Sequence, residues 1–192
     1  MKKIGLTGGI GSGKTTASKI FQIMGVPIYN SDIIAKKILK TNISVKKNII
    51  KNFGKQVLTN NKLDNKKIAS LIFKKEDKLK IINSIIHPLV KKDFSNWCKK
   101  QKNTYIIKES ALMFTSSAYE ELDYIIFTKC PLNLRLKRII SRDQKNKKEI
   151  FSIMKNQSSD IFLEKKCDYI IQNDEKSSLL KQVLKLHEIF IK

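Results

Sequence analysis

Residues 6–15 of the chain read Leu6-Thr7-Gly8-Gly9-Ile10-Gly11-Ser12-Gly13-Lys14-Thr15. From Gly8 onward this stretch matches G-x-x-x-x-G-K-[ST], the pattern of a phosphate-binding loop. The residues before it, Lys2–Thr7, read as a short buried strand. Residues 15–24 have the apolar spacing of a helix. A strand that passes through a glycine loop into a helix is the setting that this motif requires, so a merely flexible glycine turn is disfavoured.

The residue types in this loop suit the phosphates of ATP or GTP. Glycines allow turns that aim successive backbone N–H groups inward, and the start of the following helix adds the positive end of its dipole. Lys14 is expected to bridge the β- and γ-phosphates, and the Thr15 hydroxyl to ligate Mg²⁺. The expected nucleotide-binding residues are Gly8, Gly9, Ile10, Gly11, Ser12, Gly13, Lys14, Thr15 and Thr16.

The rest of the chain reads as an α/β protein with a parallel sheet. Gly25 ends the first helix, and residues 26–29 read as a second strand that leads to Asn30-Ser31-Asp32. This beginning predicts parallel strands joined by crossover helices. Further strands are expected at residues 105–107, 124–128 and 168–171, and helices at residues 131–140 and 177–190.

Two segments depart from this alternation. Residues 34–99 are lysine-rich and helical in pattern, with Pro88 expected at the first turn of a helix, and we expect them to form a substrate-binding insertion. Residues 138–165 are charged and suit a mobile lid. The predicted fold is a single three-layer α/β sandwich like that of P-loop kinases, with residues 1–33, 100–137 and 166–192 as its nucleotide core.

Composition argues against several other classes of protein. The formal net charge is +22, but only 3 of the 39 basic residues are arginines, and the lysines are spread over the whole length. Proteins that bind nucleic acid usually mix arginine with lysine and place aromatic residues among them, so nucleic acid is not the expected partner. No membrane span is expected. Three cysteines without a C-x-x-C pair indicate neither disulfides nor zinc, and we expect a cytoplasmic protein.

A GTPase is one alternative, because Asn61-Lys62-Leu63-Asp64 spells the guanine-reading pattern N-K-x-D. That pattern should follow a buried strand, whereas here it lies in a polar run, and no D-x-x-G occurs in the chain to sense a γ-phosphate. We therefore interpret it as an accident of composition.

A kinase for a small metabolite agrees better with the remaining residues. Asp32 follows the second strand, where parallel sheets present their ligands, although it also suits the N-cap of a helix. Arg135, Arg138 and Arg142 fall on one helical face that leads into the predicted lid. A forked donor is useful for a transferring phosphoryl group, but a chance cluster on a solvated face gives the same spacing.

These residues resemble the dephospho-CoA kinase family along nearly the whole chain. The similar segments are LTGGIGSGKT (6–15), NSDIIAK (30–36), LD (63–64) with IF (72–73), IHPL (86–89), ALMF (111–114), Arg138 with Arg142 and Asp143, and DYII (168–171) with Asn173. The chain departs from the family pattern at Asn30, where an aspartate is usual, at Lys36, where an arginine is usual, and at Thr115, where a glutamate is usual.

The resemblance implies transfer of a phosphoryl group from ATP to the ribose 3′-hydroxyl of dephospho-CoA. Asp32 would act as the base or orient that hydroxyl, while Lys14, Arg138 and Arg142 would neutralise charge on the moving group. Asn173 would contact the nucleotide, and Lys36 and His87 the acceptor, although His87 also suits a structural role. ATP, Mg²⁺ and small-molecule substrates are the implied partners, with no obligate protein partner. Another metabolite or nucleotide kinase, or a nucleic-acid-dependent ATPase, remain the alternatives.

Overall fold

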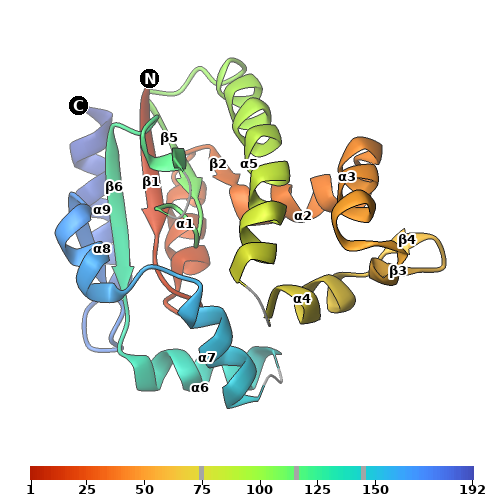
Figure 1. The fold of residues 1–192 in the computed structure, drawn as a ribbon. Helices are drawn as coiled ribbons and strands as arrows, with labels where there is room; N and C mark the ends of the chain where they lie inside the picture. The colour runs from red at the N-terminus through yellow and green to blue at the C-terminus, as the bar shows by residue number, and fades with distance from the viewer. Residues whose placement is uncertain (74–75, 115–116, 144–145) are drawn as a thin grey trace. The chain divides into compact units, whose positions relative to one another are not determined.

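The computed structural model describes residues 1–73, 76–114, 117–143 and 146–192 (Figure 1). These residues divide into two compact units. The first unit contains Met1–Asn30 and Gln101–Lys192, and the second contains Ser31–Lys100.

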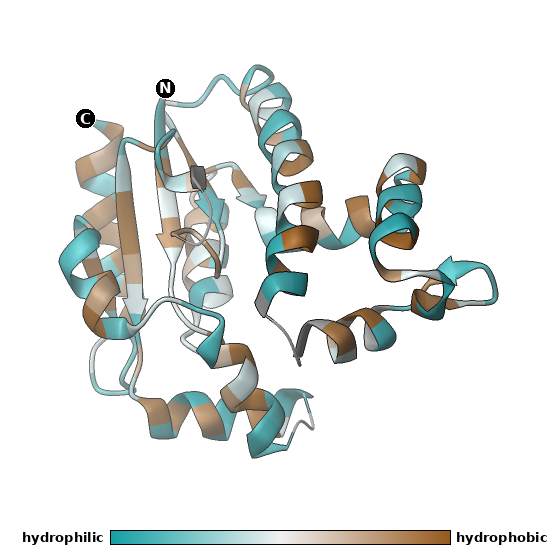
Figure 2. Cartoon of the chain, in the orientation of Figure 1, coloured by the Kyte–Doolittle hydropathy of each residue, from teal (hydrophilic) through white to brown (hydrophobic). Residues whose placement is uncertain are grey.

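The first unit is built on a five-stranded sheet in which every pair of neighbouring strands is parallel. The strands, in their order across the sheet, are β2 (Ile28–Asn30), β5 (Tyr105–Glu109), β1 (Lys2–Thr7), β6 (Tyr124–Lys129) and β7 (Tyr169–Gln172). Figure 2 shows β6 coloured mostly as hydrophobic, as expected for a strand that is covered on both faces. The α/β class with a parallel sheet, expected from the sequence, is confirmed.

One face of the sheet packs against α1 (Lys14–Ile23) and α9 (Leu179–Ile191). The residues of this core are apolar and buried: Ile4, Leu6, Ala17, Phe21, Val26, Tyr105, Ile107, Ile126, Ile171, Val183, Leu186 and Phe190. Because Ile4 and Leu6 alternate with Gly5, β1 turns its larger side chains toward these two helices. Burial of this face fixes the register of the central strand that feeds the glycine loop.

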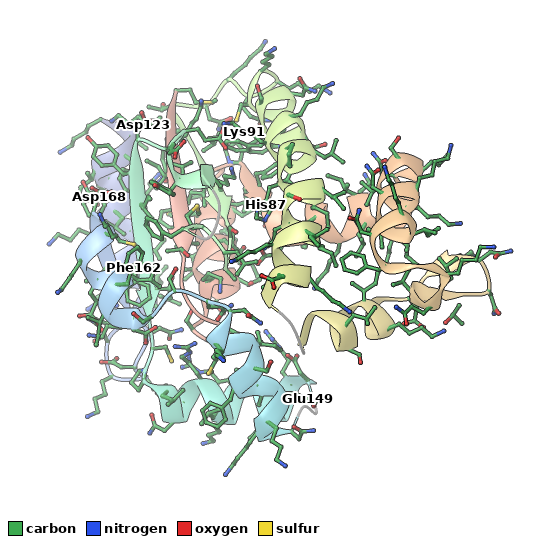
Figure 3. All side chains as sticks on the ribbon, in the orientation of Figure 1. His87, Lys91, Asp123, Glu149, Phe162 and Asp168 are labelled. Carbon is green, nitrogen blue, oxygen red and sulfur yellow. The ribbon has the colours of Figure 1, made fainter. Side chains whose placement is uncertain are left out.

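The opposite face is covered by the chain between β5 and β7. A Cβ atom on Gly5 would lie 2.8 Å from Leu122 Cδ1, so this segment packs closely on β1. Beyond β6 come α6 (Leu132–Asp143), α7 (Lys147–Lys155) and α8 (Asp160–Lys166). Right-handed crossovers to strands on opposite sides of β1 place α1 and α8 on opposite faces, which gives three layers. The Phe162 ring of α8 meets Phe114 edge-on, with 5.5 Å between ring centroids (Figure 3).

Two aspartates fix the amino ends of the strands. Asp123 Oδ2 accepts a hydrogen bond of 2.6 Å from the backbone N–H of Lys3, and Asp168 Oδ2 accepts one of 2.8 Å from that of Ile125. Both side chains are labelled in Figure 3. These bonds hold neighbouring strands in register at the end of the sheet opposite the glycine loop.

The second unit consists of α2 (Ser31–Thr41), α3 (Ile43–Phe53), α4 (Asn65–Phe73) and α5 (Glu76–Cys98), with a short 3₁₀ turn η1 (Lys55–Val57). Helix α2 packs against α5. The prediction that Pro88 begins a helix is wrong, because Pro88 lies inside α5. Four buried residues at a spacing of four, Ile82, Ile86, Val90 and Phe94, continue on both sides of it. Their burial offsets the backbone hydrogen bond that proline cannot donate.

The N-K-x-D pattern lies in the second unit and not in the five-stranded sheet. It overlaps a two-stranded hairpin of β3 (Leu58–Thr59) and β4 (Lys62–Leu63). Asn60 and Asn61 make the turn with φ angles of 48° and 58°, a conformation that asparagine tolerates well. The sequence predicts only a polar interruption here, and the hairpin was not predicted.

The segment predicted to be a charged lid contains helices α7 and α8, which the sequence analysis did not expect. Asn146 and Glu149 form a capping box at the start of α7, and Ser159 caps α8 (Figure 3). Ile150 and Leu163 are the buried residues of the two helices. Caps and apolar anchors therefore stabilise a segment whose composition is mostly polar.

In the described ranges of the chain, no helix is long and apolar enough to cross a membrane.

Candidate nucleotide-binding and phosphoryl-transfer site

The glycine loop joins the carboxyl end of β1 to the first turn of α1. Within the loop, the N–H of Ser12 donates to the Gly9 carbonyl over 3.1 Å. Gly13 precedes the helix in a left-handed conformation (φ 93°), and no side chain caps the helix. The N–H groups at the start of α1, together with the helix dipole, therefore form an anion-binding end.

The loop glycines are also required by the side chains around them. A Cβ atom on Gly9 would overlap the guanidinium of Arg135, and one on Gly13 would overlap the amide of Asn173. The Asn173 amide donates a hydrogen bond of 2.8 Å to the Ser12 carbonyl. Asn173, expected to contact nucleotide, thus touches the phosphate loop itself.

Lys14 lies over the loop as the motif predicts. Its side chain is buried, and Nζ donates to the carbonyls of Gly8, over 2.7 Å, and of Gly9, over 3.2 Å. These bonds hold the ammonium group at the centre of the loop, where the β- and γ-phosphates of a nucleotide would lie. Thr16 continues α1, its N–H donating to the Gly13 carbonyl.

Thr15 is paired with a buried carboxylate. Its hydroxyl donates a hydrogen bond of 2.8 Å to Glu109 Oε1. The hydroxyl of Ser18, one turn later on α1, donates one of 2.8 Å to Glu109 Oε2. Glu109 is the last residue of β5 and is only 3% exposed. In the register of the sheet it stands beside Asn30 of β2.

This pair of oxygen ligands suits Mg²⁺. Magnesium usually keeps several waters and is held by one or two protein oxygens together with substrate phosphates. Among the described residues, no group of three or more His, Cys, Asp or Glu side chains is placed to hold a metal by itself. Thr15 and Glu109 therefore fit an ion that arrives with a nucleotide.

The three arginines of α6 have different contacts, although they share one helical face. Arg138 donates from Nη2 to Glu175 over 3.1 Å and from Nη1 to Cys130 Sγ over 3.3 Å. Burial raises the pKa of the Cys130 thiol, so this sulfur is a neutral acceptor. Arg142 is exposed and is paired with its neighbour Asp143 over 2.7 Å, which raises the pKa of Arg142. Arg135 is buried and turns toward the glycine loop.

The expected acceptor-side residues lie in the second unit. Asp32 is in the first turn of α2, which begins at Ser31, so Asp32 is inside the helix and is not its N-cap. Lys36 is exposed one turn further along the same helix. His87 is partly buried on α5, next to Pro88 (Figure 3). Thr115 lies outside the described residues.

Two residues that contact the loop were not predicted from the sequence, Glu109 and Gln157. The bond of Glu109 to Thr15 was not foreseen. Gln157, which accepts a hydrogen bond from the N–H of Ile10, was not considered at all. The signal for Glu109 was its position at the end of a buried strand that pairs with β1.

Comparison with known proteins agrees with this geometry. A family model described as dephospho-CoA kinase matches residues 2–178. A dephospho-CoA kinase of Bacteroides fragilis is 36% identical over 188 residues, which cover 96% of this chain and 90% of that protein. The structure of a dephospho-CoA kinase from Campylobacter jejuni is similar with a TM-score of 0.66 and 29% identity, over 98% of this chain and 96% of that one. A structure from Thermus thermophilus has the same fold, with a TM-score of 0.88 at 22% identity, over 100% of this chain and 98% of that one.

Proposed function

Because the chain belongs to the dephospho-CoA kinase family, whose reaction is the ATP-dependent phosphorylation of dephospho-CoA to coenzyme A, we propose that it catalyses this reaction at the glycine loop. In detail, the γ-phosphoryl group of ATP passes to the ribose 3′-hydroxyl of dephospho-CoA. The observation that carries this proposal is the set of contacts around the loop: Lys14 at its centre, and Thr15 bonded to the buried Glu109.

The donor half of the reaction rests on the loop and on α1. The N–H groups of the loop and of the first turn of α1 bind the phosphates, and Lys14 neutralises charge between the β- and γ-phosphates. Mg²⁺ bound with ATP would supply positive charge to stabilise the transferring phosphoryl group. Thr15 would hold the ion directly, and Glu109 would hold it directly or through a water.

We assign the acceptor half to three residues of the second unit. Asp32 acts as the base or orienting group for the 3′-hydroxyl, and its position in the first turn of α2 supports the role, because the helix dipole favours a carboxylate there. Lys36, one turn later, is placed on the same helix to meet a substrate phosphate. His87 positions the acceptor by a hydrogen bond.

Two arginines of α6 stabilise the transferring group in this proposal. Arg138 and Arg142 offer forked donors that match phosphate oxygens. For both, binding the phosphoryl group requires exchange of the present partners, Glu175 and Asp143. Glu175 is exposed in the first pair and Arg142 in the second, and ion pairs at the surface contribute little to stability, so the exchange costs little.

We further propose that residues 34–99 act as the substrate-binding insertion and that residues 138–165 close over the bound nucleotide. Closure would exclude water, so that ATP is not hydrolysed uselessly. ATP and dephospho-CoA are the expected partners, without nucleic acid or an obligate protein partner. Cys98, Cys130 and Cys167 are free thiols, which suits the proposed cytoplasmic location.

A coupled ADP-release assay tests the proposed acceptor. Dephospho-CoA should support turnover, while AMP, CMP and shikimate should not. Activity confined to one of these controls would overturn the acceptor and leave the donor site intact. ATP turnover that depends on DNA or RNA, with binding that weakens steeply as salt rises, would instead support a nucleic-acid-dependent ATPase.

A further inference from the structure

Both backbone polar groups of Ile10, in the glycine loop, are bound by side chains from distant parts of the sequence. The N–H of Ile10 donates a hydrogen bond of 2.9 Å to Gln157 Oε1, and the Ile10 carbonyl accepts one of 3.0 Å from Arg135 Nε. Arg135 belongs to α6, and Gln157 to the connection between α7 and α8. All three residues lie in the first unit.

Arg135 is held firmly in this position. Its side chain is only 8% exposed, and Nη1 donates to both carboxylate oxygens of Asp160, over 3.2 and 3.3 Å. Asp160 is the first residue of α8. The guanidinium also lies against Gly9, where there is no room for a Cβ atom. A buried guanidinium is costly unless its donors have partners, and here the loop carbonyl binds Nε and Asp160 binds Nη1.

Peptide geometry gives these contacts a consequence for nucleotide binding. A trans peptide is planar, and its C=O and N–H point in opposite directions. Because Arg135 holds the Ile10 carbonyl, the N–H of Gly11 in the same peptide points away from Arg135. The preceding peptide, between Gly9 and Ile10, is fixed in the same way. Its carbonyl, that of Gly9, accepts hydrogen bonds from the N–H of Ser12 and from Lys14 Nζ, and its N–H, that of Ile10, points to Gln157.

We propose that Arg135 is a positioning residue of the phosphate loop, with Gln157 as its partner on the adjacent peptide. Together they keep the two peptides on either side of Ile10 from rotating, so that the N–H of Gly11 faces the nucleotide and the Ile10 carbonyl faces away. A rotated peptide would present a carbonyl oxygen to the phosphates and repel them. Arg135 acts through the loop and does not touch the reacting atoms. The inference rests on the proposed function only in taking ATP as the ligand of this loop.

Arg135→Lys is the decisive variant, because it keeps the positive charge but lacks a donor at the position of Nε. Lysine therefore cannot hold the Ile10 carbonyl and Asp160 as arginine does. We expect the equilibrium affinity for a fluorescent ATP analogue to fall by about tenfold or more, and KM for ATP to rise with it, while kcat changes much less. Lys137→Ala, at an exposed position of the same helix, is the matched control and should bind ATP like the wild type.

Two further variants decide the matter if Arg135→Lys does not fold. Gln157→Ala removes the acceptor for the Ile10 N–H, and Asp160→Asn loosens the anchor of Arg135; each should weaken ATP binding in a folded protein. A purely structural Arg135 would instead lower the melting temperature of Arg135→Lys and leave ATP affinity within twofold of the wild type, and that result overturns the proposal. Unchanged affinity for ATP in both Gln157→Ala and Asp160→Asn would also overturn the proposal. A wild-type protein that binds ATP but does not phosphorylate dephospho-CoA would overturn the proposed acceptor alone.

Discussion

The hydroxyl of Thr15 donates a hydrogen bond of 2.8 Å to the carboxylate of Glu109, at the end of the neighbouring strand β5. The bond joins the residue expected to ligate Mg²⁺ to a carboxylate that is almost fully buried. In the sheet register Glu109 stands beside Asn30, where the family pattern described above has an aspartate. Asparagine therefore places an uncharged side chain beside the Glu109 carboxyl group, where a second carboxylate would repel it.

Glu109→Gln tests whether this carboxylate serves the metal. Glutamine keeps the length of the side chain but removes the charge, so the Mg²⁺ concentration for half-maximal activity should rise by about tenfold to a hundredfold. Binding of Mn²⁺ in the presence of ATP, followed by electron paramagnetic resonance, should weaken in parallel.

Glu164→Gln is the control for this variant, since Glu164 forms an exposed pair with Lys129. If Glu109→Gln needs no more metal than Glu164→Gln, Glu109 has no role toward Mg²⁺ and only anchors Thr15 and Ser18.

Asp32→Asn tests the proposed base. The amide has nearly the same shape but cannot accept the proton of the 3′-hydroxyl, so kcat should fall by about 10² to 10⁴. ATP affinity should change little, because the proposal places Asp32 on the acceptor. Asp77→Asn, at an exposed carboxylate of α5 in the same unit, should have normal turnover. Near-normal turnover in Asp32→Asn would remove the role of base.

Arg138→Lys tests the need for a forked donor. The charge is kept but the fork is lost, so kcat should fall by on the order of tenfold or more with a smaller effect on KM for ATP. Arg142→Lys should lower kcat in the same way. Turnover at the wild-type level in both variants would show that the two guanidinium groups serve only their pairs with Glu175 and Asp143.

The sequence predicted the sheet better than it predicted the helices around it. Strand β1 is found at Lys2–Thr7 as expected, because its apolar residues lead directly into the glycine-rich loop. Helices α7 and α8 were missed because their stability comes from caps and from a few buried side chains, such as Ile150 and Leu163, in a sequence that is otherwise polar. Pro88 was misread because local rules place proline at a helix start, whereas packing on both sides continues the helix.

The candidate site was predictable where a short motif carries the chemistry. Residues 8–15 could be read directly, since each fixed position of the motif has a known task. Glu109 and Gln157 could not, because their roles depend on hydrogen bonds to residues 94 and 147 positions away in the sequence. The shared helical face of Arg135, Arg138 and Arg142 follows from their spacing in α6, but spacing alone did not reveal that Arg135 is buried against Gly9 of the loop.

Phe190→Ala tests the packing that holds α9 on the sheet. The Phe190 ring lies 5.3 Å from Tyr169, 5.5 Å from Tyr105 and 6.0 Å from Tyr124, measured between ring centroids. Its loss should destabilise the protein by about 3 to 5 kcal/mol in urea unfolding. Leu184→Ala on the exposed side of the same helix should cost less than about 1 kcal/mol. Equal effects of the two variants would contradict the assignment of Phe190 to the core.

The most direct measurement of the central claim is the position of the new phosphate after reaction of ATP with dephospho-CoA. We predict one ADP for each coenzyme A formed, with phosphorus and proton magnetic resonance placing a phosphate monoester on the ribose 3′-carbon. Release of ADP with free phosphate, or a monoester on any other hydroxyl, would contradict the proposed transfer.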